Sequence, residues 1–543
     1  MATDPSTALD SSRNAFGTFG GVFTPSILTI LGVIMFMRTG YVVGEAGVWG
    51  ALGILTLASA ITFLTGLSIS AISTNIQVEG GGAYFLISRS LGPAYGGAIG
   101  LALFLAQALS VPFYILGFVE AFVALVPSMS EHFFLIGATV TAVLYVVNIV
   151  GANLAIKAQY FILAVLIASV IAFLSGGLSN FSVELLQTNA NPVWDENGLS
   201  FWVLFAVFFP AVTGIMAGVN MSGDLKDPAQ SIPKGTLAAI AVGFVVYAAQ
   251  IIITGGAIER QTLIDEPYDS LLAQAIFGFS PVVIAGVFAA TLSSALGSFL
   301  GAPRILQALA RDGVFPILRP FAKGSAKGDE PRRGLALTAI LTVGVLYAAG
   351  NGSGGGALNA VAAVLTMFFL YTYGVTNLAA FIEHITRNPS FRPRFRFFHW
   401  STALAGAAGC VFAAVLINPV AAVVSLALVA IVFIYIENRM LETTFGDARR
   451  GFFYARTRTN LTKLVDQTPH PKNWRPTALV LSGNPKHRKT LTQYAAWMES
   501  GRGIVTLAQV IVGKYEDTVA EREEALVSLT AYIAEHRLAA FPE

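Results

Sequence analysis

Long apolar runs separated by short polar segments dominate the chain between about residue 22 and residue 438. Most of the runs approach or exceed the roughly twenty residues that an α-helix needs to cross a bilayer. Asn418 and Pro419 mark a tight turn between the last two runs. The pattern predicts an all-α membrane domain of about twelve spanning helices, at 22–46, 48–74, 93–126, 132–151, 156–177, 200–222, 235–258, 276–303, 335–349, 357–383, 400–417 and 419–437.

The composition supports a multi-spanning membrane protein rather than a globular domain with one anchor. Hydrophobic residues make up 55% of the 543 residues and charged residues only 12%, whereas soluble domains carry about 25% charge. The net charge of +2 gives no reason to expect a nucleic-acid partner. We find no metal-spaced His/Cys cluster and no nucleophile–base pair, so the sequence predicts neither an enzyme nor a bound cofactor.

The basic residues predict the orientation in the bilayer, because Lys and Arg gather in cytoplasmic loops. With the N-terminus inside, only Arg38 and Arg260 fall on the outer side. The inner side receives fifteen: Arg89, Lys157, Lys226, Lys234, Arg304, Arg311, Arg319, Lys323, Lys327, Arg332, Arg333, Arg387, Arg392, Arg394 and Arg396. An even number of helices then places both termini in the cytoplasm, in a multi-pass protein of the cell membrane.

The polar ends of the chain predict two further regions. Residues 1–20 read as a flexible cytosolic tail and residues 21–438 as the membrane domain. Residues 439–543 hold most of the remaining charge and predict a small cytosolic α/β domain. Its strands are expected at 475–483 and 503–513, and its helices at 486–500 and 516–538. Two parallel strands are too few for independent stability, so the domain is either incomplete or completed by a partner, with a homodimer as one candidate.

Two of the predicted spans contain helix-disrupting residues in their middle. The first has Thr29 and Gly32 within PSILTILGVIMFMR, and the sixth has Pro210, Thr213 and Gly214 within FFPAVTGIMAGVNMSG. These are equivalent places in two five-helix halves, and interrupted helices at matching positions indicate the binding site of an inverted-repeat transporter. Freed carbonyls suit a cation, and freed N–H groups suit an anion. The alternative is that the glycines only allow close helix packing, or that Pro210 only kinks its helix.

Hydroxyl groups in other spans extend the candidate site. Ser293 and Ser294 follow Ala290 by three and four residues, so the three share one face of the eighth span. Tyr114 and Tyr373 place phenols near the middle of the third and tenth spans, where a hydroxyl needs a partner. Each signal is weak alone, because such serines commonly bond to the preceding helical turn and such tyrosines commonly pack.

Arg38 and Glu120 are candidates for a gate on the outer side of the site. Intramembrane charges are costly and are usually paired. The hypothesis is a salt bridge that closes the outer vestibule, and the alternative is that both side chains reach the interface independently.

Several blocks in this order resemble the cation-chloride cotransporter family: LGVIMFMRTGYVVGEAG, FLTGLSISAISTNIQVEGGGAYFLISRSLGP, FFPAVTGIMAGVNMSGDLKDPAQSIPKGT, ATLSSALGSFLGAPRILQALARDGVFP and NWRPTALVLSGNP. The resemblance covers roughly residues 16–543. It implies a LeuT-like 5+5 inverted repeat with broken helices 1 and 6, as in the amino acid–polyamine–organocation superfamily. It also implies secondary active cotransport of chloride with alkali cations.

The resemblance assigns ions to individual residues. Potassium would contact the main chain at Thr29 and Ile30, the Tyr114 hydroxyl, the Pro210 carbonyl and the Thr213 hydroxyl. The family usually has Asn where this chain has Thr29. One chloride would lie on the amides of Gly32, Val33 and Ile34, and a second on those of Gly214, Ile215 and Met216 with the Tyr373 hydroxyl. Sodium would lie on the carbonyls of Leu28, Leu31 and Ala290 with the hydroxyls of Ser293 and Ser294.

The serine pair resembles sodium-dependent members and Tyr114 resembles potassium-using members, so the Na-K-2Cl branch is favoured. A potassium-chloride or sodium-chloride cotransporter remains an alternative. An amino acid permease of the same fold is a further one, as is a non-transporting scaffold whose cytosolic domain mediates assembly.

Overall fold

The computed structural model describes residues 16–75, 81–150, 152–192, 199–325, 329–350, 356–385, 391, 394–438, 448–465 and 474–543. Residues 1–15 of the predicted tail, together with Lys327, Arg387 and Arg392 of the charge count, lie outside these ranges. The chain divides into two compact units, Met1–Arg456 and Thr457–Glu543. The predicted boundary after residue 438 stays a prediction.

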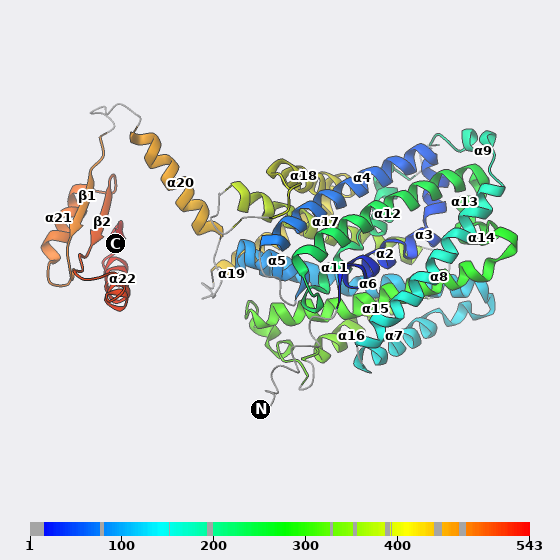
Figure 1. Cartoon of the computed structure of the whole chain (residues 1–543), viewed down its shortest axis with the longest axis horizontal. Helices are drawn as coiled ribbons and strands as arrows, with labels where there is room; N and C mark the ends of the chain where they lie inside the picture. The colour runs from blue at the N-terminus through cyan, green and yellow to red at the C-terminus, as the bar shows by residue number, and fades with distance from the viewer. Residues whose placement is uncertain are drawn as a thin grey trace. The chain divides into compact units, whose positions relative to one another are not determined.

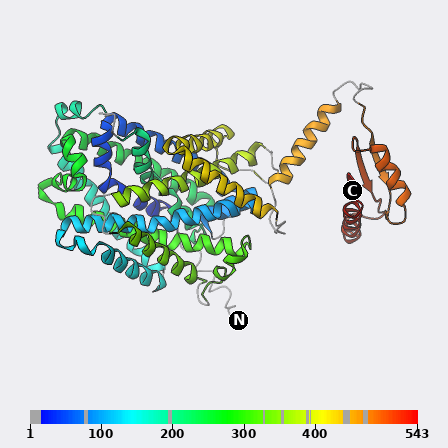
Figure 2. The ribbon, with the colours of Figure 1, turned by 180° about the vertical axis from the view of Figure 1, so that it is seen from behind.

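Twelve helical segments of the described chain are long and apolar enough to cross a membrane, which confirms the predicted number of spans. Long helices of the first unit lie alongside one another in both views (Figures 1 and 2). The segments are Phe19–Met37, Thr39–Asn75, Tyr95–Leu125, Pro127–Ile149, Ala158–Ser179, Phe201–Asn220, Pro228–Ala257, Ser280–Arg311, Arg332–Ala349, Gly356–Ile385, Trp400–Ile417 and Pro419–Glu437. The 5+5 inverted repeat stays a prediction.

The spans are built from the helices labelled in Figure 1. The first is composite, with the π-helical turn η1 (Phe19–Phe23), α2 (Thr24–Ile30) and α3 (Val33–Met37). The sixth is also composite, with α10 (Phe201–Phe208), the 3₁₀ turn η3 (Phe209–Val212) and α11 (Ile215–Asn220). The others are α4 (Thr39–Asn75), α6 (Pro93–Leu125), α7 (Phe133–Val150), α8 (Ala152–Ser179), α12 (Pro228–Ala257), α15 (Ser280–Arg311), α16 (Arg332–Ala349), α17 (Gly356–Ile385), α18 (Trp400–Ile417) and α19 (Pro419–Glu437).

Helix α4 contains a backbone break at Gly47, whose φ of 68° and ψ of 169° are not helical. A side chain at this position would collide with the main chain of Asn191, with a Cβ only 2.6 Å from its carbonyl carbon. Glycine is therefore required by both the positive φ and the close approach. The break falls between the first two predicted runs, which end at residue 46 and begin at residue 48.

Shorter elements connect the spans and cover their ends. They are η2 (Pro127–His132), η4 (Ser222–Asp224), η5 (Ile276–Gly278), η6 (Pro316–Phe321), α5 (Gly82–Leu91), α9 (Val183–Thr188), α13 (Arg260–Asp265) and α14 (Pro267–Ala273). Helix α5 is tied to the end of α15, because Arg89 forms a salt bridge with Asp312 at 2.9 Å and the Tyr84 hydroxyl donates to the same carboxylate at 2.6 Å. Burial and the neighbouring Asp312 raise the pKa of Tyr84, so its hydroxyl remains a donor at neutral pH.

The second unit holds a parallel sheet in the order β1 (Thr477–Leu481), β2 (Ile504–Ala508) and β3 (Ala540–Pro542). Residue Thr477 pairs with Ile504, and Val505 with Ala540. The helices are α21 (Lys489–Glu499) and α22 (Val519–Glu535), and α20 (Ala448–Val465) crosses the division between the units. The sequence predicted β1 and β2 but missed β3, because three residues ending in proline carry no strand pattern.

Candidate functional site

The helix of the first span is interrupted at Leu31 and Gly32. Leu31 has φ −82° and ψ 43°, and Gly32 has φ −92° and ψ −145°, so neither continues the helix. Helix α2 therefore ends at Ile30, and α3 begins at Val33 with no side-chain cap. The N–H groups at the start of α3 and the carbonyls at the end of α2 lose their regular helical partners.

The sixth span is interrupted more gently. Helix α10 tightens into the 3₁₀ turn η3 at Pro210, which has no N–H to donate, and α11 begins only after Gly214. Gly214 itself keeps near-helical angles, with φ −59° and ψ −11°. The Thr213 hydroxyl donates to the Pro210 carbonyl over 2.9 Å, so these two predicted potassium ligands lie together.

The two interruptions meet. A Cβ at Gly214 would lie 2.7 Å from the main-chain nitrogen of Ile30 and 2.9 Å from the carbonyl oxygen of Ser26. A Cβ at Gly218 would lie 2.7 Å from the carbonyl oxygen of Val22. The close-packing explanation of these glycines therefore also holds. The contact brings the end of α2 against the start of α11.

The remaining predicted potassium residues surround this contact. The Thr29 hydroxyl donates to the Pro25 carbonyl at 2.8 Å, which is consistent with a main-chain role for Thr29 at an ion. Tyr114 is buried in α6, and its hydroxyl makes no hydrogen bond within the described part of the chain. One helical turn later, Gly117 packs against the side chain of Val33 at the first interruption.

The five predicted sodium residues are buried where α2 and α15 contact each other. Ser294 donates to the Leu28 carbonyl at 3.3 Å, and Ser293 donates to the Ala290 carbonyl at 3.1 Å. Leu31 is the residue at which the main chain leaves the helix. Hydroxyl and carbonyl oxygens from two helices thus gather in one buried place, as a hard cation requires.

The predicted chloride positions coincide with the two helix starts. The amides of Gly32, Val33 and Ile34 open α3, and those of Gly214, Ile215 and Met216 open α11; neither start has a side-chain cap. The Tyr373 hydroxyl reaches the second start, where it donates to the Thr213 carbonyl at 2.8 Å. A chloride at this helix start would have to accept the Tyr373 hydroxyl hydrogen together with the Thr213 carbonyl, or in its place.

Arg38 and Glu120 form a bidentate salt bridge, with N–O distances of 2.9 and 3.0 Å. The Arg38 side chain is 4% exposed and the Glu120 side chain 24%. Arg38 also donates to the Asn359 side chain at 2.6 Å and to the Met37 carbonyl at 2.7 Å. These bonds link the end of α3 to two further helices, α6 and α17. Asn359 on α17 is a partner that the sequence did not indicate.

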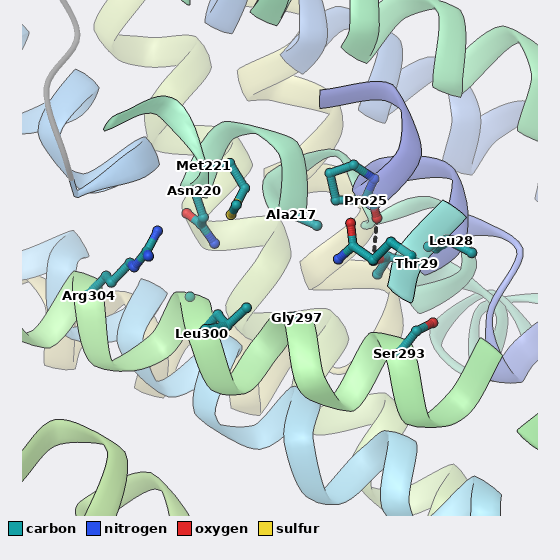
Figure 3. A pocket seen from close by; sticks show the side chains of 12 residues that line it. Pro25, Leu28, Thr29, Ala217, Asn220, Met221, Ser293, Gly297, Leu300 and Arg304 are labelled. Carbon is teal, nitrogen blue, oxygen red and sulfur yellow. Dashed lines mark hydrogen bonds between the residues drawn. The ribbon is translucent and has the colours of Figure 1, made fainter. Parts of the chain in front are cut away.

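A cavity of about 20 Å³ lies beside the first interruption. Figure 3 shows Thr29 and Ser293 at one end of it and Asn220 and Arg304 at the other. All twelve lining residues come from the first, fifth, sixth and eighth spans or from Met221 just after the sixth: Pro25, Leu28, Thr29, Gln159, Ala217, Asn220, Met221, Ser293, Gly297, Leu300, Gly301 and Arg304. The volume holds about one water-sized particle.

Two polar residues of α12 were missed by sequence reasoning. Tyr247 donates to the Ile30 carbonyl at 2.7 Å, and Gln250 donates to the Met35 carbonyl at 2.7 Å. Both side chains are buried and lie one helical turn apart, so they support the main chain on each side of the interruption. A tyrosine and a glutamine three residues apart in an apolar run were the available signal.

Twelve spans with two interrupted helices in contact define a class of multi-spanning membrane transporter. Residues 21–480 match the amino acid permease family. The chain therefore belongs to this family. Its members are permeases, so the prediction of a transporter rather than an enzyme is confirmed.

Individual relatives narrow the assignment within the family. The chain is 32% identical to mouse solute carrier family 12 member 2 over 97% of its own length and 47% of the relative's. It is 33% identical to the Squalus acanthias protein of the same name, with 97% and 48% covered, and 32% identical to human solute carrier family 12 member 1, with 97% and 52% covered. The chain spans about half the length of these relatives. These similarities confirm the resemblance to the cation-chloride cotransporters that the sequence blocks indicated.

Proposed function

We propose that the protein is a secondary active, electroneutral cotransporter of chloride with sodium and potassium that works by alternating access. The observation that supports this most is the contact between the two interrupted helices at Gly214 and Ile30. There, carbonyl groups at the end of α2 and amide groups at the start of α3 and α11 lie within one buried region. Such a region binds ions of both signs without a charged side chain.

Potassium is held by the main chain at Thr29 and Ile30, the carbonyl of Pro210 and the hydroxyls of Thr213 and Tyr114. The Tyr114 hydroxyl supports this proposal, since the residue is buried and the hydroxyl has no hydrogen-bond partner in the described chain. A potassium ion would satisfy its oxygen.

The chlorides occupy the two helix starts, one on Gly32, Val33 and Ile34 and one on Gly214, Ile215 and Met216 with Tyr373. Sodium lies between Leu28, Leu31 and Ala290 and the hydroxyls of Ser293 and Ser294. The hydrogen bond from Ser294 to Leu28 supports a shared sodium position, because it already brings two of the ligands together.

Adjacent ions of opposite sign explain the coupling. Moving one net charge across the membrane costs about 2.3 kcal/mol per 100 mV. One sodium, one potassium and two chlorides sum to zero charge, so the loaded carrier would cross without that cost. A partly loaded carrier would hold an uncompensated charge in low dielectric, which disfavours its closure.

The difference between the two ends of the site supports alternating access. Arg38, Glu120 and Asn359 join the elements on the predicted outer side. The cavity instead extends toward Arg304, on the predicted cytoplasmic side. We therefore interpret the structure as a conformation that is closed outside.

Rubidium uptake into proteoliposomes, with sodium and chloride omitted in turn, tests the proposal. Loss of uptake on omitting either ion supports sodium-potassium-chloride cotransport. Rubidium uptake that depends on chloride alone would indicate a potassium-chloride cotransporter. Sodium-dependent chloride uptake without rubidium transport would indicate a sodium-chloride cotransporter. Absence of chloride dependence refutes all three.

An amino acid permease is the second candidate function, because the matched family carries that description. In such a protein the first interruption would receive a carboxylate and the sixth an amine. The cavity beside Thr29 holds about one water-sized particle, which suits an ion better than an amino acid. Uptake of labelled amino acids into the same proteoliposomes distinguishes the two.

The second unit is proposed to form a homodimer. Large apolar side chains are exposed on it, among them Leu479 and Leu481 on the edge strand β1 and Trp497 on α21. Exposed apolar surface of this kind favours association. Light scattering of the purified full chain, compared with Leu479→Glu and Leu481→Glu, measures whether the dimer depends on this strand.

A further inference from the structure

The loop between α17 and α18 combines basic and aromatic residues at high density. Four arginines fall within ten residues of it: Arg387, Arg392, Arg394 and Arg396. The chain contains no Asp or Glu between Glu383 and Glu437, so the segment holds no carboxylate of its own to balance them. The loop is therefore a strongly positive segment.

The two arginines of this loop that the structure describes are unpaired. Arg394 and Arg396 are exposed, and neither forms a salt bridge or a hydrogen bond within the described part of the chain. Arg89, on the same predicted side of the membrane, instead pairs with Asp312 at 2.9 Å. The described chain thus leaves the charge of Arg394 and Arg396 to a partner from outside it.

Aromatic contacts tie the loop to the ends of both helices. His384 on α17 lies edge-on to Phe398, with ring centroids 5.8 Å apart, and Phe381 on α17 packs against Trp400 at 6.3 Å. Phe397 is nevertheless 75% exposed, and Trp400 is 39% exposed. Exposed rings beside basic residues are typical of segments that lie among lipid headgroups.

The position of the loop in the chain places it at a bilayer surface. Helix α17 ends at Ile385 and α18 begins at Trp400, and both helices are long and apolar enough to span the membrane. The distribution of basic residues predicts the cytoplasmic side for this loop. The cytoplasmic leaflet carries anionic lipids, and clusters of about four or more Lys and Arg directly beside a spanning helix bind them.

We propose that the loop between α17 and α18 binds the phosphate groups of anionic phospholipids through Arg394 and Arg396. A guanidinium presents paired N–H donors that match the oxygens of a phosphate. The exposed ring of Phe397 lies among the headgroups beside them. Lipid binding holds the inner ends of α17 and α18 at the bilayer surface. The proposal goes beyond ion cotransport and does not depend on which ions the protein carries.

Native mass spectrometry of the purified full chain tests this lipid surface. The protein is equilibrated in detergent with phosphatidylglycerol or with phosphatidylcholine, and the dissociation constant of each lipid is measured. An arginine near an anionic surface is worth about a fivefold change in affinity. Arg394→Gln combined with Arg396→Gln should therefore raise the dissociation constant of phosphatidylglycerol about 25-fold, and change that of phosphatidylcholine less than about twofold.

Two further double variants serve as controls. Arg394→Lys with Arg396→Lys keeps both charges, so it should bind phosphatidylglycerol within about threefold of the wild type. Arg502→Gln with Arg537→Gln removes the same charge from exposed positions of the second unit, neither of which adjoins a spanning helix in the sequence. This matched control should leave the affinity for both lipids unchanged. Elution of each variant as the wild-type species on size-exclusion chromatography checks folding.

Several results would overturn the lipid surface. Equal affinity of the wild type for the two lipids would show that the loop does not select anionic headgroups. A loss in the lysine variant or in the matched control as large as in the glutamine variant would show that the charge of this loop is not the cause. Displacement of phosphatidylglycerol by inorganic phosphate at similar concentration would make the loop a site for soluble anions instead.

Discussion

The Arg38–Glu120 salt bridge should control how readily the outer pathway closes. The decisive change is Glu120→Gln, which removes one charge while keeping the shape of the side chain. Arg38 would retain its bonds to Asn359 and to the Met37 carbonyl, so the guanidinium would remain partly satisfied. The variant therefore perturbs the pair with little effect on folding.

The geometry gives the magnitude. Breaking a fully buried pair costs about 3–5 kcal/mol. Glu120 is 24% exposed and Arg38 keeps two other partners, so we expect the lower figure of about 2 kcal/mol. If the pair forms only when the outer side is closed, the closed state loses about 30-fold in population. Turnover should fall by a similar factor wherever closure limits the cycle.

Rubidium uptake at saturating ion concentrations measures this loss of turnover. The double variant Arg38→Glu with Glu120→Arg, in which the two charges are exchanged, tests whether the loss comes from the broken ion pair. A glutamate at position 38 would face the Met37 carbonyl, so recovery should be incomplete, at roughly a third of wild-type uptake. The Asn359 amide can rotate to offer its NH₂ group instead. Single variants that keep full uptake, or an exchange that recovers nothing beyond the singles, would refute a gate.

Three other substitutions test the ion positions. Ser294→Ala should raise the half-saturating sodium about tenfold, because an oxygen ligand is lost, whereas Ser298→Ala, one turn further along α15, should not. Tyr114→Phe should weaken potassium dependence and chloride uptake together by about tenfold, and undiminished chloride flux with potassium dependence abolished would contradict adjacent-ion coupling. Gly214→Ala should lower the free energy of unfolding by about 1–3 kcal/mol, because its Cβ would collide with Ile30, and should therefore lower the thermal midpoint and the uptake. The matched control is Gly344→Ala, because a Cβ at Gly344 meets nothing within 4 Å.

The sequence predicted the spans well because bilayer thickness imposes a length that apolar runs must match. It also located both interruptions, because helix-disrupting residues fall at matching positions of the two predicted halves. It did not predict that the two interruptions differ in backbone conformation. Gly214 remains near-helical while Gly32 does not, because Thr213 and Tyr373 hold the second segment in a tight turn. Tyr373, which supplies the second of these restraints, lies 160 positions along the chain from Thr213.

Long-range partners explain most of what sequence reasoning missed at the site. Asn359 meets Arg38 across 321 residues, and Tyr247 meets Ile30 across 217. Asn359 lies in no local pattern that distinguishes it, and Tyr247 has only the weak signal of a polar pair with Gln250 in an apolar run. Only the arrangement of α12 and α17 around the first span reveals them.

The partners of the first interruption also indicate how an ion could bind there at low cost. Tyr247 donates to Ile30 and Ser294 donates to Leu28, so two carbonyls at the end of α2 are already satisfied. A carbonyl oxygen has two lone pairs and can accept a cation beside an existing hydrogen bond. The Ser294 hydroxyl differs, because its hydrogen must turn away from Leu28 before its oxygen can face sodium. Binding would then cost about one neutral hydrogen bond, roughly 1 kcal/mol. Such a cost is small beside the attraction of a cation for several oxygens, so the main chain at the first interruption needs no rearrangement to bind.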